Sequence, residues 1–163
     1  MMQKYCLDTN IFIEPWNNFY SIQFTKGYWE ILESLAQKEI IFSASEVKRE
    51  IEKVDDNLLK WLKGKSFFKN PNTDVQEQMR EIMKKYPRLV DPTKGRSIAD
   101  PWVIAHAQAE NAVVVTLEQK ATKPGHIKIP DVCKKEGIEC IDIYELIKHL
   151  KIEFTAKIKK SLY

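Results

Sequence analysis

Long apolar runs, paired cysteines and a strong net charge are all absent from this 163-residue sequence. A helix that crosses a bilayer needs roughly 18 consecutive apolar residues, and the longest apolar runs here, at 102–105 and 112–115, have four residues each. We therefore expect neither a membrane span nor a membrane partner. The three cysteines form no CxxC pair, which argues against a disulfide framework or a structural zinc site and favours a reducing, cytoplasmic location. With 26 Lys and Arg against 23 Asp and Glu, the net charge of +3 does not by itself indicate a nucleic-acid partner.

The composition is that of one folded domain. Single domains usually have between roughly 100 and 200 residues, and a chain of this length buries about 68–70% of its unfolded surface. The 4 Trp, 6 Tyr and 7 Phe, against only 5 Gly and 7 Pro, argue against disorder. We expect one domain over residues 1–152, followed by a basic tail over residues 153–163.

Short β-type runs alternate with longer helical patterns along the chain. We expect strands at 4–8, 39–43, 112–116 and 138–141, helices at 28–37, 45–62, 74–86, 98–111, 131–136 and 144–150, a turn at 8–10 and a long loop at 117–130. Strands separated by helices pair in parallel through right-handed crossovers. This predicts a Rossmann-like, three-layer α/β/α sandwich with a mostly parallel sheet of four to five strands. Ligands of such sheets bind at the carboxyl ends of the strands.

Three acidic residues are expected at this edge of the sheet. Asp8 directly follows the first strand, Glu118 lies two residues beyond Thr116 at the end of another, and Asp100 precedes Pro101 at the start of a helix. Carboxylates gathered at one site repel each other unless a cation neutralises them, and oxygen-only ligands suit Mg²⁺ or Mn²⁺. Each acid also has a structural interpretation: an Asx-turn for Asp8, a helix N-cap for Asp100 and a solvated loop residue for Glu118.

The helix expected at 45–62 offers a fourth carboxylate. With about 100° per residue, both Glu50 and Asp55 fall on an edge of its apolar stripe. The helical wheel does not choose between them, and either could be a boundary acid beside Arg49 or Lys53.

In these segments the sequence resembles a PIN domain, the nuclease fold of many toxins in bacterial and archaeal toxin–antitoxin systems. The matching segments are 5–11, 45–51, 99–105 and 114–118, with the strand and helix at 138–150 closing the pattern. The chain is also similar, more narrowly, to a PIN-like family of unknown function, through Ala-Asp-Pro-Trp at 99–102 and a basic loop that leads to 129–133.

The resemblance implies an acidic site in which the same four side chains bind metal and carry catalysis. These are Asp8, Glu50, Asp100 and Glu118. The resemblance thereby favours Glu50 over Asp55. This sequence departs from the family pattern at Glu118, where the family more often has Asp. The hydroxyl of Thr116 could orient a neighbouring carboxylate or water, and Asn10 is a candidate for the same supporting layer. The implied reaction is Mg²⁺- or Mn²⁺-dependent hydrolysis of RNA phosphodiester bonds, by a toxin that a cognate antitoxin restrains.

Basic stretches offer contacts for such a substrate despite the small net charge. Residues 119–135 carry five lysines against one aspartate, and residues 148–163 do the same against one glutamate. We expect substrate contacts from Arg96, Lys120, Lys123 and Lys128. Solvated surface lysines are the structural alternative.

Two other functions remain open. An aspartyl-nucleophile phosphotransferase also places an aspartate after its first strand, but the haloacid-dehalogenase-like pattern Asp-x-Asp is replaced here by Asp8-Thr9-Asn10. A catalytically inactive PIN-like module for RNA binding or scaffolding is the stronger alternative, because Glu118 departs from the family pattern. A homodimer is compatible with the sequence, which does not decide the oligomeric state.

Overall fold

A five-stranded parallel sheet runs through the centre of the protein. The computed structural model describes residues 2–91, 93 and 97–155. Its strands are β1 (Tyr5–Leu7), β2 (Ile41–Ala44), β3 (Phe68–Lys69), β4 (Val113–Val115) and β5 (Cys140–Ile141). They lie in the order β3-β2-β1-β4-β5, and each neighbouring pair is parallel. The register aligns Tyr5 with both Ile41 and Val113, so β1 lies at the centre.

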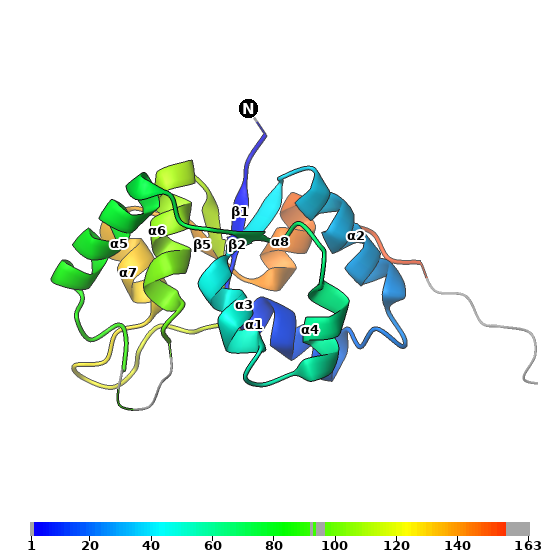
Figure 1. The fold of residues 1–163 in the computed structure, drawn as a ribbon, viewed down its shortest axis with the longest axis horizontal. Coiled ribbons are helices and arrows are strands. Elements are labelled where there is room, and N and C mark those ends of the chain that lie inside the picture. The colour runs from blue at the N-terminus through cyan, green and yellow to red at the C-terminus, as the bar shows by residue number, and fades with distance from the viewer. Residues whose placement is uncertain (1, 92, 94–96, 156–163) are drawn as a thin grey trace, which may run out of the picture.

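Helices cover both faces of this sheet (Figure 1). They are α1 (Asn10–Glu14), the π-helical segment η1 (Pro15–Phe19), α2 (Lys26–Gln37), α3 (Ser45–Ile51), α4 (Asp56–Leu62), α5 (Thr73–Lys85), α6 (Asp100–Glu110), α7 (Ile129–Glu136) and α8 (Ile143–His149). In Figure 1, α5, α6 and α7 lie on one side of the strands, and α1, α2 and α8 lie on the other. The predicted three-layer α/β/α sandwich with a parallel sheet is therefore confirmed.

The central strands are buried on both faces, which explains their unbroken apolar sequence. Leu7 on β1 and Val114 on β4 have no exposed surface. The buried hydroxyl of Ser43 on β2 donates a hydrogen bond of 2.6 Å to the carbonyl of Leu7, which satisfies a polar side chain inside the core. Within the described part of the chain, none of the helices has the length and apolar character needed to cross a membrane.

The prediction of one continuous helix over 45–62 is wrong. The segment forms two helices, α3 and α4, and the chain breaks between Ile51 and Asp56. The side chain of Asp55 accepts hydrogen bonds from the amides of Asn57 (3.1 Å) and Leu58 (2.9 Å) and so caps α4. Because an N-cap residue has an extended backbone, α3 cannot continue through it.

Two shorter elements also differ from expectation. The segment after Asp8 is helical from Asn10 onward instead of forming only a turn. The chain also forms the two-residue strand β3, which pairs Phe68 with Ser43 at the edge of the sheet and was not predicted. Both elements depend on contacts with distant segments, which local sequence preference does not report.

Candidate functional site

Asp8 lies at the carboxyl end of β1, beside the end of β4. Its backbone amide continues the sheet by donating to the carbonyl of Val115 at 2.9 Å. One carboxylate oxygen, Oδ1, accepts from the amide of Thr9 at 2.7 Å, and the other, Oδ2, accepts from the hydroxyl of Thr116 at 2.7 Å. Asp8 is 3% exposed, so these bonds hold a nearly buried carboxylate in a fixed orientation.

Thr116 and Asn10 form the network that supports Asp8. The Thr116 hydroxyl accepts from Asn10 Nδ2 at 3.2 Å and from the amide of Glu118 at 3.0 Å. Since these two donors occupy its acceptor side, its own proton is directed to Asp8. Asn10 Oδ1 in turn accepts from the amide of Leu117 at 2.9 Å. These hydrogen bonds connect the start of α1 to the segment that follows β4.

Glu50 reaches the same place from α3. Its Oε2 accepts from the Thr9 hydroxyl at 2.6 Å, and its Oε1 accepts from the amide of Ala99 at 3.0 Å, just before α6 begins. Glu50 therefore joins the segment after β1 to the start of α6. Asp55, the alternative that the helical wheel left open, caps α4 instead.

Asp100 is the first residue of α6 and is 6% exposed. The N-cap of this helix is Ala99, and no side chain makes a capping hydrogen bond there. The alternative interpretation of Asp100 as the helix N-cap is therefore wrong. Its side chain instead lines the same pocket as Asp8 and Glu50.

Glu118 combines a structural contact with a place at the site. Its Oε2 accepts from the amide of Ile129, the first residue of α7, at 3.2 Å. The side chain is half-buried and lines the same pocket as the other acids. The longer side chain of Glu, where Asp is more usual, thus reaches the start of a helix as well as the pocket.

One pocket of about 190 Å³ collects these side chains. It is lined by Asp8, Thr9, Asn10, Ile13, Glu14, Glu50, Ser97, Asp100 and Glu118. Among the residues that the structure describes, the lining contains no Lys, Arg or His. Five carboxylates thus meet around one cavity without a cationic side chain.

Sequence reasoning missed Glu14, which follows Asn10 by four residues and so lies one helical turn further along. Recognising α1 would have revealed it. It is exposed, and its carboxylate accepts from Asn18 at 2.7 Å.

The crowding of buried carboxylates raises their pKa values. Burial, which removes water from the charged form, is the main cause of the rise of the Asp8 pKa from 3.8 to about 7. The hydrogen bond from Thr116 opposes this rise, and the charges of Glu118 and Glu50 add to it. Burial and then the charge of Asp8 raise the pKa of Asp100 to about 9. Negative charge is therefore costly here unless a cation accompanies it.

The carboxylate oxygens that line the pocket suit a hard divalent cation such as Mg²⁺. In the described ranges, no group of three or more His, Cys, Asp or Glu side chains meets as a preformed metal site. Mg²⁺ usually keeps several waters and takes only one or two protein carboxylates directly, so it does not require such a closed cage. Asp8 and Asp100 are the best placed to hold it, because both are buried and because burial and the neighbouring carboxylates raise the pKa of both, so that a cation would relieve an unfavourable charge there.

Only some of the basic residues that were predicted to contact the substrate lie near the acidic pocket. Lys128 lines a cavity of about 290 Å³ that also contains Asp100 and Glu118. Lys120 lines a different cavity, on the side of Glu118 that faces β5. Lys123 is exposed and lines none of the cavities found in the described part of the chain. Arg96 and the lysines of the tail at 157, 159 and 160 lie outside the described residues.

Two further groups beside the acids, Arg88 and His126, were not predicted. His126 lies in the basic stretch 119–135, where only lysines were expected to contact the substrate, and Arg88 lies in a loop without a recognisable motif.

Comparisons with known proteins agree with this architecture. The model of a family described as "Domain of unknown function (DUF4411)" matches residues 5–154. No curated protein matches the chain.

Two solved structures share the fold. VapBC2 from Rickettsia felis, bound to a DNA fragment from its promoter, has a TM-score of 0.50 and 23% identity over 77% of this chain and 97% of that chain. VapBC-1 from nontypeable Haemophilus influenzae has a TM-score of 0.51 and 18% identity over 86% of this chain and 98% of that chain. At these identities the likeness establishes a common fold.

Proposed function

Since the chain belongs to the DUF4411 family and has the PIN-like fold expected from its sequence, we propose that it is a Mg²⁺- or Mn²⁺-dependent endoribonuclease. The observation that carries this proposal is the pocket in which carboxylates from β1, α3, α6 and the segment after β4 meet without a cationic side chain in its described lining. Such a pocket favours a divalent cation and, through it, a phosphate group.

Each acid has a distinct part in the proposed reaction. When bound, Mg²⁺ or Mn²⁺ would lower the pKa of a water and neutralise charge on the phosphate and the leaving oxygen. Asp8 and Asp100 would hold the ion, with Thr116 fixing the direction of the Asp8 carboxylate. Glu50 joins the hydroxyl of Thr9 to the amide of Ala99 at the start of α6, so we assign it the positioning of Thr9 and of α6.

Hydrolysis by this route needs no protein nucleophile. Cys6 and Cys133 are buried, and Cys140 is half-buried, consistent with packing roles. Glu118 keeps one carboxylate oxygen beyond the one bonded to Ile129, and that oxygen would complete the acidic lining.

The deciding experiment is cleavage of mixed RNA, with single-stranded DNA in parallel, in Mg²⁺, Mn²⁺ or EDTA. Asp8→Ala and Asp100→Ala should each abolish cutting, and EDTA should do the same to the wild type. Asp55→Ala is the matched control. It also removes an aspartate, but Asp55 caps α4 and lies outside the pocket. Cutting that survives both pocket substitutions would contradict the proposal. RNA binding without cutting, unchanged in Asp8→Ala, would favour the inactive RNA-binding or scaffolding module.

We further propose that the enzyme acts in the cytoplasm as the toxin of a toxin–antitoxin pair. The resemblance to PIN-domain toxins and the fold shared with the two VapBC structures support this. Expression of the wild type should arrest growth, and Asp8→Ala should relieve the arrest. A homodimer and a cognate antitoxin are further expectations, and size-exclusion chromatography of the protein alone and after co-expression with a neighbouring small open reading frame tests them.

A further inference from the structure

A continuous row of cavities leads away from the acidic pocket on one side. The next cavity, of about 290 Å³, shares Ser97, Asp100 and Glu118 with the acidic pocket. Its lining also includes Ile127 and three basic side chains, Arg88, His126 and Lys128. A third cavity, of about 430 Å³, shares Arg88, His126 and Ile127 with the second and adds residues of α5 and α7. We call the row beyond Asp100 the basic groove, after Arg88, His126, Lys128 and Lys135.

The positive charges of the basic groove are mostly not neutralised by the protein. Within the described ranges, no carboxylate lies within 4 Å of the cationic groups of Arg88, Lys128 or Lys135. The Arg88 guanidinium donates to the carbonyl of Gly125 at 3.5 Å, and Lys135 Nζ lies 5.5 Å from the centroid of the Tyr86 ring. All three side chains are exposed, so each is available to an anion in the groove.

The carboxylates near this groove lie at its acidic end or outside its lining. Asp91 lines the second cavity, whereas the described lining of the third cavity contains no carboxylate. Glu136 lies outside that lining and is bonded to Lys85 (2.9 Å) and to the hydroxyl of Tyr86 (2.6 Å). The groove is therefore acidic where it opens on Asp100 and increasingly basic with distance from it.

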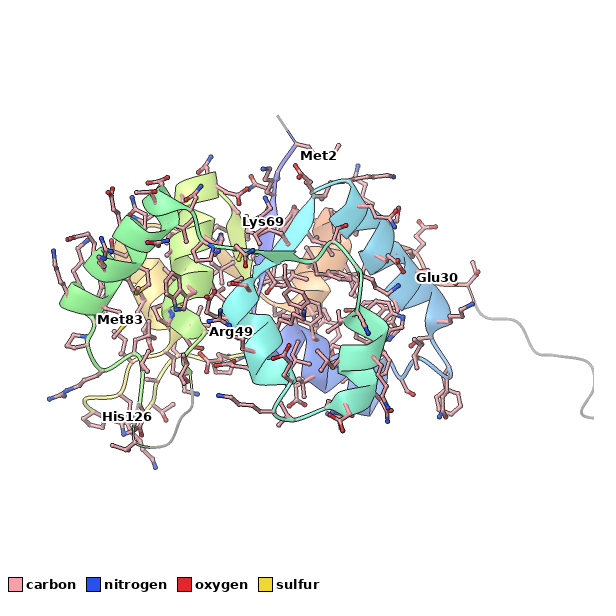
Figure 2. All side chains as sticks on the ribbon, viewed as in Figure 1. Met2, Glu30, Arg49, Lys69, Met83 and His126 are labelled. Atoms are coloured by element: carbon pink, nitrogen blue, oxygen red, sulfur yellow. The ribbon has the colours of Figure 1, made fainter. Side chains whose placement is uncertain are left out.

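The two loops that form the walls of the groove are held in place by contacts with the rest of the protein. One wall is the loop after α5, where Leu89 is 3% exposed and anchors the chain in the core. The other wall is the long loop after β4, which Asp131 on α7 holds by accepting from the amides of Ala121 and Lys128, both at 3.0 Å. Figure 2 shows His126 where these two loops come together, at the lower left of the view.

We propose that the basic groove binds the backbone of an RNA strand on one side of the bond to be cut. A row of separate, exposed cations along an open groove matches a polyanion with regularly spaced phosphates, whereas one small anion would need them gathered at a point. The strand passes from the acidic pocket over Lys128, Arg88 and His126 toward Lys135. This inference rests on the proposed function and adds the direction in which the substrate lies.

The test measures binding of a fluorescently labelled RNA 20-mer by anisotropy in EDTA, so that cleavage does not interfere. Arg88→Ala and Lys135→Ala should each weaken binding about fivefold near 0.1 M salt, and each should reduce the slope of log K against log salt by about 0.7. Lys60→Ala is the matched control, because Lys60 is exposed on α4, far from the groove, and carries the same charge. It should leave both quantities unchanged. The melting temperatures of all three variants should equal that of the wild type, which would show that weaker RNA binding does not result from a loss of stability.

The outcomes separate this inference from the proposed function. If the wild type binds and cuts RNA, and the two groove variants bind as tightly as Lys60→Ala, the groove assignment is wrong while the nuclease proposal stands. Equal weakening by all three substitutions would also overturn it, because the effect would then follow net charge instead of position. If the wild type neither binds nor cuts any RNA, the proposed function itself fails.

Discussion

Replacing Asp8 by asparagine should stabilise the metal-free protein at neutral pH, although it destroys the proposed activity. The Asp8 carboxyl has a higher pKa in the folded protein, about 7, than its ordinary value of 3.8. The folded state therefore holds the proton more tightly than the unfolded chain does. It follows that stability falls as the pH rises from about 4 through about 7. Asparagine has nearly the same shape and carries no charge at any pH, so it should remove this loss.

The size of the effect follows from the pKa shift and the hydrogen bonds. A rise of about 3 pKa units corresponds to about 4 kcal/mol of lost stability by pH 7, at 1.36 kcal/mol per unit. Asparagine keeps one oxygen acceptor but replaces the other with an amide donor, so the bond from Thr9 or that from Thr116 is lost, at a cost of about 1 kcal/mol. We expect Asp8→Asn to raise the free energy of unfolding by about 2–3 kcal/mol at pH 7.5 and to change it by less than about 1 kcal/mol at pH 4, where the wild-type carboxyl is itself protonated and uncharged.

Urea unfolding in EDTA at the two pH values, followed by tryptophan fluorescence, measures this difference. Asp55→Asn is the control, because asparagine caps a helix as well as aspartate does, and it should change little at either pH. Saturating Mn²⁺ at a hundred times its dissociation constant should stabilise the wild type by about 2.7 kcal/mol and Asp8→Asn much less. If Asp8→Asn is destabilising to the same extent at both pH values, the electrostatic reasoning about this pocket is wrong.

Three further changes test other parts of the structure. Thr116→Val should reduce cleavage about 10- to 100-fold, because it removes the donor to Asp8, and a matching drop in Mn²⁺ affinity by calorimetry would separate this from simple destabilisation. Asp55→Ala should lower the free energy of unfolding by about 1 kcal/mol through loss of the α4 cap, with cleavage rates retained. The Glu110 pKa is raised by burial but lowered overall by hydrogen bonds from Lys69 and Lys4, so Glu110→Gln should cost about 1 kcal/mol at pH 7 and progressively less as the pH falls below 4.5. A Glu110→Gln effect independent of pH would show that these lysines contribute no charge interaction.

The elements with strong local patterns were predictable from the sequence. The run Val113-Val114-Val115 forms β4, and the helix expected over 98–111 forms as α6, Asp100–Glu110. Parallel topology then brings Asp8, Asp100 and Glu118 to one edge, because parallel strands place their carboxyl ends together. The pocket that they share follows from this rule and from the order of the elements.

The errors occurred where local preference and tertiary contacts disagree. Apolar spacing continues across Asp55, so periodicity alone predicts one helix over 45–62, whereas side-chain hydrogen bonding by Asp55 starts a second one. The residues from Asn10 onward resemble a turn in their local sequence. The side chain of Asn10, however, donates a hydrogen bond to the Thr116 hydroxyl and accepts one from the Leu117 amide, and these bonds hold the start of α1 at the site.

What the sequence determined by itself was the layered α/β architecture and the presence of acids at the ends of its strands, because both follow from short-range periodicity and chain order. The choice of Glu50 over Asp55 followed from a family resemblance, and the structure gives its physical basis in the bonds of Glu50 to Thr9 and Ala99. Only the tertiary structure placed Glu14 in the acidic pocket and set Arg88 and His126 along a groove that opens on it. These residues lie in loops or short helices whose positions are decided by long-range packing, which no pattern of neighbouring residues encodes.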